Sequence, residues 1–293
     1  MSQKSYDNSP TLYLIPTPIG NLDDITLRAI DTLKSVEVVF CEDTRITRQL
    51  LNHLGISKKL IASHKFNEEM NSDKLLSYLN NGQDVGLVTD RGTPIISDPG
   101  YELVKVAIDN NYNVVSLPGP TAFVPALTVS GLSPQPFLFY GFLNNKGSKR
   151  EKELESLKDY PFTMIFYEAP HRIVETLESI EKVLGNKNIC ISREISKKFE
   201  EVYRGKISDI LSDMVDVKGE LVIVVEGNTE EKTYDNLSII EHVNLYIMNG
   251  MDKKEAIKKV SKDRGISRHN PLRCNRGTRL PPARLLCTRV CVQ

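Results

Sequence analysis

Short apolar runs alternate with amphipathic stretches through the first 120 residues. The apolar runs predict strands at Leu12–Pro16, Val36–Cys41, Lys59–Ala62, Asp84–Thr89 and Asn113–Leu117. Apolar positions at helical spacing predict helices between them, at Ile25–Lys34, Thr44–Leu54, Glu68–Leu79 and Tyr101–Asn110. Apolar strands separated by single helices are typical of a parallel sheet covered on both faces. We therefore predict an N-terminal α/β lobe over residues 1–118, with its ligand site in the loops that leave the strands.

The pattern changes after Pro118, where several strands are joined by short turns. Strands are predicted at Phe137–Gly141, Phe162–Glu168, Ile189–Ser192, Glu200–Arg204 and Glu220–Glu226. The helices expected between them lie at Ser148–Lys158, Arg172–Leu184 and Ser208–Val215. Residues 119–228 therefore form a second, mixed-sheet α/β lobe in this prediction. A helical pair at Ile239–Met248 and Lys253–Val260 makes residues 229–269 a small helical segment.

The last 24 residues, 270–293, differ abruptly from the rest of the chain. They contain five arginines, no lysine and no acid, and they hold three of the five cysteines. A shifted reading frame or a non-native extension explains this change better than a genuine Arg/Cys module does. A zinc site is weakly supported, because Cys274 has no near partner to complete a finger-like spacing with Cys287 and Cys291.

Composition narrows the class of protein. With 293 residues, 40% hydrophobic and 26% charged, the sequence is typical of a soluble globular chain. The longest apolar runs fall far short of the roughly 20 residues that span a bilayer, and the N-terminus lacks the apolar region of a secretory signal. Cys41 and Cys190 lie in hydrophobic segments and are interpreted as reduced core thiols. We therefore expect a cytoplasmic protein with no membrane partner.

The most informative loop is Thr89–Gly100, directly after an apolar strand. It combines two glycines, two prolines, three small hydroxyl residues and two acids. Glycine permits close backbone approach and proline stiffens the path, so the loop suits a polar cofactor edge read by the backbone. The simpler interpretation is a strand-to-helix turn with Ser97 or Asp98 as the N-cap. We favour a binding loop, because a cap needs fewer residues.

Two more rigid turns follow predicted strands. Pro16–Leu22 and Pro118–Ala122 are rich in proline and glycine, and Thr121 is a candidate cap for the next helix. Neither is a Gly-x-Gly-x-x-Gly fingerprint, and the chain has no Gly-x-x-x-x-Gly-Lys-Ser/Thr motif. A dinucleotide oxidoreductase and a P-loop kinase thereby lose their main support.

Two charged motifs also stand at strand ends. Glu42-Asp-Thr-Arg45 places two carboxylates and a guanidinium there, although a solvated helix start explains it equally well. In Glu168-Ala-Pro-His-Arg172, Pro170 is suited to the first turn of a helix. A functional interpretation has Arg172 holding a phosphate and His171 or Glu168 handling a proton. No metal-ligand cluster is evident, so no metal is expected.

Five motifs together, in this order, resemble the tetrapyrrole methylase family, and in particular its branch that acts on ribosomal RNA. They are Pro16-Thr-Pro-Ile-Gly-Asn-Leu, Cys41-Glu-Asp-Thr-Arg, Asp90-x-Gly-Thr-Pro-x-Ile-Ser-Asp-Pro-Gly, Leu117-Pro-Gly-Pro-Thr-Ala and Tyr167-Glu-Ala-Pro-His-Arg. The segments Arg193–Glu200 and Gly219–Gly227 also fit. The resemblance runs from about residue 11 to 269.

This resemblance implies a two-lobed α/β fold with S-adenosylmethionine bound between the lobes. It also implies a homodimer that methylates the ribose 2′-oxygen of a cytidine in the decoding region of 16S rRNA, within the 30S subunit, and not DNA. We expect backbone-based cofactor binding by Pro18, Gly20, Asp90, Gly92, Thr93, Pro94, Ile95, Ser97, Thr121 and Ala122. Catalytic and substrate-handling roles are expected for Asp43, Arg45, Glu168, His171 and Arg172.

The chain departs from the family pattern at two places. Arg91 stands where the family loop carries alanine, and a long cation there either repels the sulfonium centre or points to solvent. Residues from Asn270 onward match no expected helix. A small-molecule methylase of the same fold, and a catalytically silent rRNA-binding protein, are the alternatives.

Overall fold

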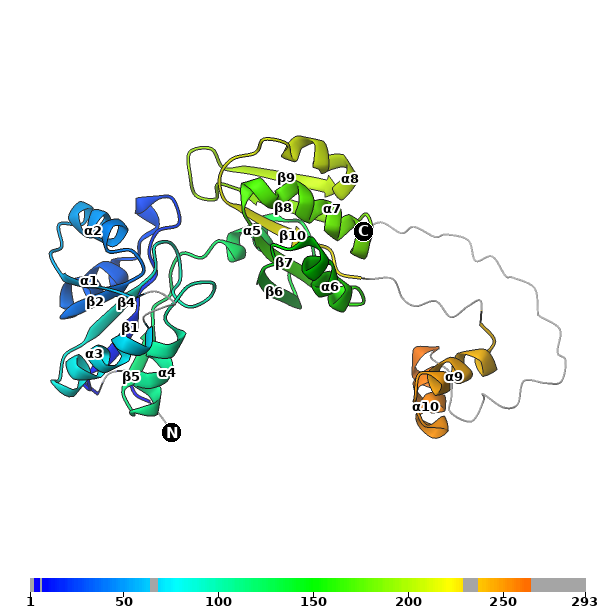
Figure 1. The fold of residues 1–293 in the computed structure, drawn as a ribbon, viewed down its shortest axis with the longest axis horizontal. Helices are drawn as coiled ribbons and strands as arrows, with labels where there is room; N and C mark the ends of the chain where they lie inside the picture. The colour runs from blue at the N-terminus through cyan, green and yellow to red at the C-terminus, as the bar shows by residue number, and fades with distance from the viewer. Residues whose placement is uncertain (1–2, 6, 64–67, 229–236, 265–293) are drawn as a thin grey trace, which may run out of the picture. The chain divides into compact units, whose positions relative to one another are not determined.

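The computed structural model describes residues 3–5, 7–63, 68–228 and 237–264 (Figure 1). It divides into two compact units, residues 1–229 and 230–293. The first unit contains two five-stranded sheets. The predicted four-part division, with boundaries after residues 118, 228 and 269, stays a prediction, and the tail 270–293 lies outside the described residues.

The first sheet is entirely parallel, with the strand order β3-β2-β4-β1-β5. Its strands are β1 (Thr11–Leu14), β2 (Val38–Cys41), β3 (Lys59–Ala62), β4 (Val85–Val88) and β5 (Asn113–Ser116). The helices between them are η1 (Leu22–Asp24), α1 (Leu27–Ser35), α2 (Thr44–His53), α3 (Glu68–Asn80) and α4 (Tyr101–Asp109). This arrangement confirms the predicted parallel α/β lobe.

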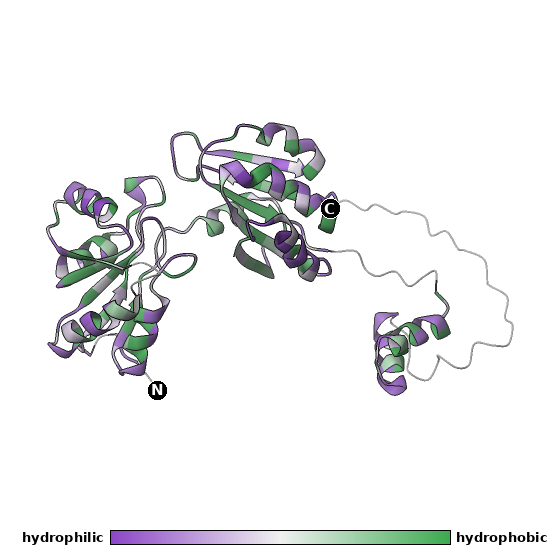
Figure 2. Ribbon diagram, in the orientation of Figure 1, coloured by the Kyte–Doolittle hydropathy of each residue, from purple (hydrophilic) through white to green (hydrophobic). Residues whose placement is uncertain are grey.

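Burial explains why this sheet forms from continuous apolar runs. Every residue of the central strands β2 and β4 is buried, because helices cover both faces. Helices α1 and α2 pack on one face through Leu33 and Leu51, and α3 and α4 pack on the other through Leu75 and Leu103. Figure 2 shows the same division, with hydrophobic strands between helices whose outer surfaces are polar.

The second sheet is mixed, with the order β6-β7-β10-β8-β9. Its strands are β6 (Phe137–Phe142), β7 (Thr163–Glu168), β8 (Asn188–Arg193), β9 (Glu201–Lys206) and β10 (Leu221–Val225). Strand β6 runs parallel to β7, and the other neighbouring pairs are antiparallel. The predicted mixed-sheet lobe is therefore confirmed.

Helices cover both faces of this second sheet as well. They are α5 (Phe123–Val129), α6 (Gly147–Leu157), η2 (Pro170–Arg172), α7 (Ile173–Leu184), α8 (Ile207–Ile210) and η3 (Leu211–Met214). Helices α6, α7 and α8 pack on one face, and α5 packs on the other against Ile165 and Val224. Helix α5 thereby lines the C-terminal lobe at the point where the chain arrives from β5.

Neither of the two candidate helix caps is observed, Ser97 or Asp98 for the helix after Thr89–Gly100 and Thr121 for the helix after Pro118–Ala122. Helix α4 begins after Gly100, which has φ +124° and makes no side-chain capping bond, so neither Ser97 nor Asp98 is its N-cap. Helix α5 begins after Ala122 and has no side-chain cap, so Thr121 does not serve that purpose. Ser97, Asp98 and Thr121 therefore lie in the loops that precede the two helices and do not cap them.

The second unit contains a helical pair, α9 (Ile239–Met248) and α10 (Lys253–Asp263). Ser238 and Glu241 form a capping box at the start of α9, and Val243, Ala256 and Val260 form the buried contact between the helices. Among the described residues, no helix has the length and apolar character needed to cross a membrane.

Candidate functional site

Three loops at the carboxyl edge of the parallel sheet are bonded to one another. The backbones of Thr17 and Gly92 exchange two hydrogen bonds, of 2.9 and 3.0 Å, which join the loops after β1 and β4. The Thr17 hydroxyl donates to the carbonyl of Thr89 at 3.1 Å. The Thr93 hydroxyl donates to the carbonyl of Pro120 at 3.0 Å, which adds the loop after β5. The predicted convergence of these strand-end loops is therefore observed.

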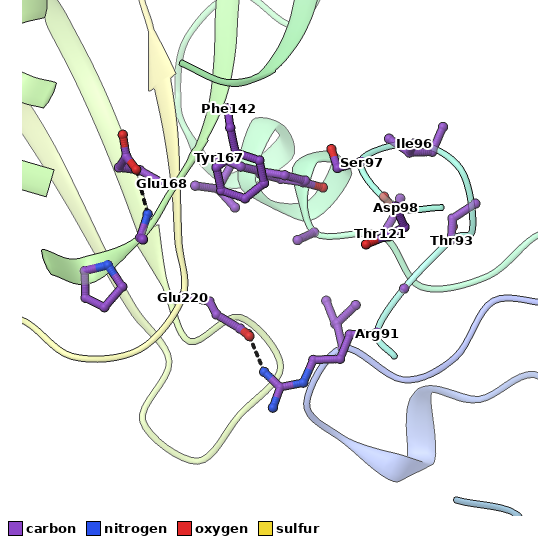
Figure 3. A pocket seen from close by; sticks show the side chains of 16 residues that line it. Arg91, Thr93, Ile96, Ser97, Asp98, Thr121, Phe142, Tyr167, Glu168 and Glu220 are labelled. Atoms are coloured by element: carbon purple, nitrogen blue, oxygen red, sulfur yellow. Dashed lines mark hydrogen bonds and ion pairs between the residues drawn. The ribbon is translucent and has the colours of Figure 1, made fainter. Parts of the chain in front are cut away.

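A cavity of about 320 Å³ opens where these loops face the second sheet (Figure 3). From the N-terminal side it is lined by Ile19, Arg91, Gly92, Thr93, Ile96, Ser97, Asp98, Thr121 and Ala122. From the other side it is lined by Phe142, Tyr167, Glu168, Ala169, Pro170, Glu220 and Val222. Its volume falls within the usual range of small-molecule sites, roughly 300–1,000 Å³.

The structure brings five of the ten predicted cofactor residues into this cavity. These are Gly92, Thr93, Ser97, Thr121 and Ala122. Three others, Pro18, Gly20 and Asp90, line a neighbouring hollow of about 460 Å³ that shares Arg91 with the first. Pro94 and Ile95 line neither hollow; Ile95 instead packs against the core under α3 and α4.

The loop after β4 has an unusual backbone. Gly92 has φ +84°, and a Cβ atom built on it would lie 3.3 Å from the side chain of Ile19. Ile95, a β-branched residue, has φ +80°, which is costly and uncommon outside functional loops. The loop therefore brings main chain rather than side chains close to the cavity at Gly92.

Arg91 lines the cavity and forms an ion pair across it. Its guanidinium donates to the carboxylate of Glu220, which precedes β10 (Figure 3). Glu220 also accepts from the Lys197 ammonium at 2.9 Å, and Lys197 binds Glu194 at 2.7 Å. Burial lowers the pKa of Lys197, but the hydrogen bonds that its ammonium donates to Glu194 and Glu220 outweigh this and raise that pKa overall. Arg91 thus belongs to a charge network that links the two lobes.

Carboxylates crowd the edge of the sheet beside the neighbouring hollow. Asp90 accepts from the backbone N–H of Asp43 at 3.0 Å, and Glu42 accepts from the Thr89 hydroxyl at 3.1 Å. Burial raises the pKa of Asp90, and the charges of Glu42 and Asp43 add to that effect. A cation or a hydrogen-bond donor is therefore favoured next to Asp90.

Asp43 and Arg45 form an exposed pair at the start of α2. Asp43 caps the helix by accepting from the Arg45 N–H at 2.8 Å, and its other oxygen accepts from the Arg45 guanidinium at 2.6 Å. The hydrogen bonds from Arg45 lower the pKa of Asp43 to about 2. The Arg45 side chain is 86% exposed, so a large polyanion can reach it.

The segment Glu168–Arg172 is held mainly by contacts within the protein. The buried Glu168 carboxylate accepts from the Thr176 hydroxyl at 2.6 Å and from the Ala169 N–H at 2.8 Å, and it lies 3.2 Å from Arg172 Nε. Arg172 also donates to the carbonyl of Leu143 at 2.8 Å. His171 is exposed on η2, which begins at Pro170 as expected. Glu168 therefore lines the cavity, Arg172 supports Glu168 without lining the cavity itself, and His171 faces outward.

Sequence reasoning missed the contributions of the second lobe to the cavity. Phe142 and Tyr167 lie at the ends of β6 and β7 with ring centroids 5.6 Å apart, and burial raises the pKa of Tyr167. Val222 completes this apolar wall. Tyr167 immediately precedes the predicted Glu168, and that adjacency was the available signal. Glu220 and Lys197 lie in the segments Gly219–Gly227 and Arg193–Glu200, which fit the family, but only the structure shows that they pair with each other and with Arg91.

No group of three or more His, Cys, Asp and Glu side chains suited to a metal ion occurs in the described ranges. Cys41 is buried in the N-terminal core, and this burial raises the pKa of its thiol to about 11. Cys190 is a buried thiol as well.

Solved structures with the same fold were found by structural comparison. A uroporphyrin III C-methyltransferase from Thermus thermophilus matches with a TM-score of 0.54 and 19% identity, over 74% of this chain and 97% of that one. The methyltransferase CobJ matches with a TM-score of 0.57 and 17% identity, over 75% of this chain and 95% of that one. At these identities the likeness shows the fold.

Sequence relatives are considerably closer. Proteins named "Ribosomal RNA small subunit methyltransferase I" are 46% identical in Bacillus subtilis (strain 168), over 91% of this chain and 94% of the relative, and 43% identical in Halalkalibacterium halodurans, over 92% and 96%. The family model described as Tetrapyrrole (Corrin/Porphyrin) Methylases matches residues 11–211. The chain therefore belongs to the tetrapyrrole methylase family.

Proposed function

We propose that this protein is an S-adenosylmethionine-dependent methyltransferase that methylates the ribose 2′-oxygen of a cytidine in the decoding region of 16S rRNA. The observation that carries the proposal is the cavity where the strand-end loops of one lobe face Tyr167 and Glu220 of the other. The names of relatives at 43–46% identity support rRNA as the substrate.

The cavity fits the methyl donor of this family. S-adenosylmethionine presents an aromatic base, a ribose and a cationic sulfonium. Phe142, Tyr167 and Val222 offer an apolar wall for the base, and the Asp98 carboxylate favours a positive charge. The close backbone at Gly92 is suited to hydrogen bonds from peptide groups. We assign cofactor binding first to Gly92, Thr93, Ser97, Thr121 and Ala122.

S-adenosylmethionine supplies an electrophilic methyl group, and the protein must place a hydroxyl in line with it. A ribose hydroxyl is a weak nucleophile at neutral pH, so positioning provides much of the acceleration. We assign phosphate contacts to the exposed Arg45 and His171, and positioning of the cavity wall to Glu168 and Arg172. Asp43 orients Arg45 through its bidentate contact.

The wider setting follows from the same proposal. The substrate is the rRNA within the assembled 30S subunit in the cytoplasm, and the protein acts as a homodimer. The 2′-hydroxyl itself distinguishes RNA from DNA.

The test offers labelled S-adenosylmethionine and the purified protein to small subunits from cells that lack this methylation. We expect label on one cytidine, on its ribose, in the decoding region. Label on a nucleobase, or on a tetrapyrrole but not on the subunit, would contradict the proposal. Calorimetry with the same donor distinguishes a methyltransferase from a catalytically silent RNA-binding protein, because the silent protein would show no affinity for the cofactor.

A further inference from the structure

The loop between β8 and β9, residues 194–200, exposes an aromatic side chain that the fold does not use. Phe199 is 66% exposed and belongs to none of the hydrophobic clusters of the described residues. The Lys198 ammonium lies over its ring, 5.5 Å from the centroid. An exposed aromatic ring beside a cationic side chain is the arrangement that single-stranded nucleic acids use for stacking.

This loop is ordered by its own hydrogen bonds. Two successive turns are closed by bonds from Lys197 N–H to the Glu194 carbonyl at 2.9 Å and from Glu200 N–H to the Lys197 carbonyl at 3.2 Å. The Glu200 carboxylate accepts from the Ser196 N–H at 2.5 Å. Arg193 fixes the base of the loop by donating to the Lys218 carbonyl at 2.7 Å. Phe199 is therefore presented on a preorganised support.

The loop also lies beside the proposed active site. The Ser196 hydroxyl is hydrogen-bonded to Asp24, and the Lys197 side chain packs against Gly20, so the loop touches the segment that follows β1 in the N-terminal lobe. The Lys197 ammonium donates a hydrogen bond to Glu220, the carboxylate that also pairs with Arg91 at the cavity. A hollow of about 470 Å³ lies between Gly20–Leu22 and Ser196–Lys198.

We propose that Phe199 stacks on an unpaired base that flanks the target cytidine, and that Lys198 pairs with an adjacent phosphate. This proposal rests on the proposed function and names a substrate contact for it. Proteins bind single-stranded RNA by stacking its bases on exposed aromatic rings beside cationic side chains, as this loop presents them. Lys197 of this loop pairs with Glu220, which lines the cofactor cavity, and this contact places the loop beside the methyl-transfer site.

Steady-state kinetics with unmethylated small subunits give the first test. Phe199→Ala removes the ring, and we expect the KM for subunits to rise roughly 5- to 150-fold, the factor that stacking of one base supplies. The kcat and the calorimetric affinity for S-adenosylmethionine stay within about twofold. Phe199→Trp, which preserves stacking, keeps the KM near that of the unmodified protein. The control is Ile108→Ala, 54% exposed in the last turn of α4, which leaves all three values unchanged.

Fluorescence gives a second, direct readout, because the chain contains no tryptophan. In Phe199→Trp the new indole is the sole tryptophan, and an oligocytidylate of about ten nucleotides quenches its emission if a base stacks on it. Ile108→Trp stays unquenched at the same oligonucleotide concentration.

The outcomes separate this proposal from the proposed function. If the unmodified protein methylates subunits but Phe199→Ala has an unchanged KM, the stacking role is wrong and the activity stands. A tryptophan at 199 that is quenched by small-subunit proteins but not by the oligonucleotide would instead make this loop a protein contact. Absence of any methyl transfer by the unmodified protein would overturn the function, while quenching at position 199 would still report RNA stacking.

Discussion

Arg91 places a permanent cation in a cavity that we assign to a cationic cofactor. Its guanidinium is turned toward Glu220, so that part of its charge is neutralised by a carboxylate of the other lobe. Both side chains are more than half exposed, and exposed pairs contribute at most about 1 kcal/mol. Arg91 is therefore compatible with cofactor binding as long as Glu220 remains.

We predict that Glu220→Ala weakens S-adenosylmethionine binding by about fivefold, because it leaves Arg91 unpaired beside the sulfonium. Arg91→Ala has a smaller effect, and the double variant recovers most of the affinity lost in Glu220→Ala. Calorimetry on the four proteins measures this. S-adenosylhomocysteine lacks the positive charge and is the control; an equal loss for both ligands would rule out the electrostatic account.

Single residues also show where sequence reasoning reaches its limit. Gly92 and Thr121 were predicted as cavity residues because each stands in a rigid loop after a strand, and loop position follows from strand pattern. The ion pair between Glu220 and Arg91 could not be predicted. The two residues are 129 positions apart in the sequence, and they meet only because β10 pairs with its neighbouring strands. Arg172 was predicted as a phosphate ligand, and only the structure shows its contacts with Glu168 and Leu143.

Among the elements, the loop from Thr89 to Gly100 determines the shape of the cofactor cavity. It joins β4 to α4. Hydrogen bonds connect it to Thr17 in the loop after β1 and to Pro120 in the loop after β5. Its glycine at position 92 combines a positive φ with close packing on Ile19. Substitution there changes both the backbone and the cavity.

We predict that Gly92→Ala lowers the free energy of unfolding by more than 1 kcal/mol and weakens cofactor binding by at least tenfold, because strain at positive φ adds to the contact with Ile19. Gly82→Ala is the matched control. Gly82 has φ +75° but no atom within 4 Å of the added Cβ, so only the backbone cost of about 1 kcal/mol applies. Denaturant unfolding measures the stability of the two variants, and calorimetry measures their affinity for the cofactor. Equal effects of the two substitutions on cofactor affinity would show that the loop does not hold the cofactor.

Elements with strong periodicity were predictable, and their ends were less so. Helix α2 and strand β3 lie within a residue of their predicted bounds, because apolar spacing and Gly55, at φ +67°, mark them locally. Helix α5 was anticipated without bounds, since Pro125 lies in its first turn and no side chain caps it. The candidate caps, Ser97 or Asp98 for α4 and Thr121 for α5, are not observed, because these residues belong to the loops preceding the helices.

At the scale of the whole molecule, two sheets contribute to the one cavity that we assign to the cofactor. The parallel sheet supplies rigid loops, and the mixed sheet supplies Tyr167 and Glu220. Neither lobe alone encloses the cavity. Cofactor binding should therefore order segments of both lobes together, and this distinguishes the account from one in which a single lobe holds the ligand.

Hydrogen–deuterium exchange with and without S-adenosylhomocysteine tests this claim most directly. The account predicts that exchange slows in peptides of both lobes together, those covering residues 91–98 and 119–122 and those covering residues 167–170 and 220–222. Each of these segments contains residues that line the cavity. Peptides at the far end of the parallel sheet, around Ile108, should exchange unchanged. Protection confined to one lobe, or found only outside these segments, would contradict it.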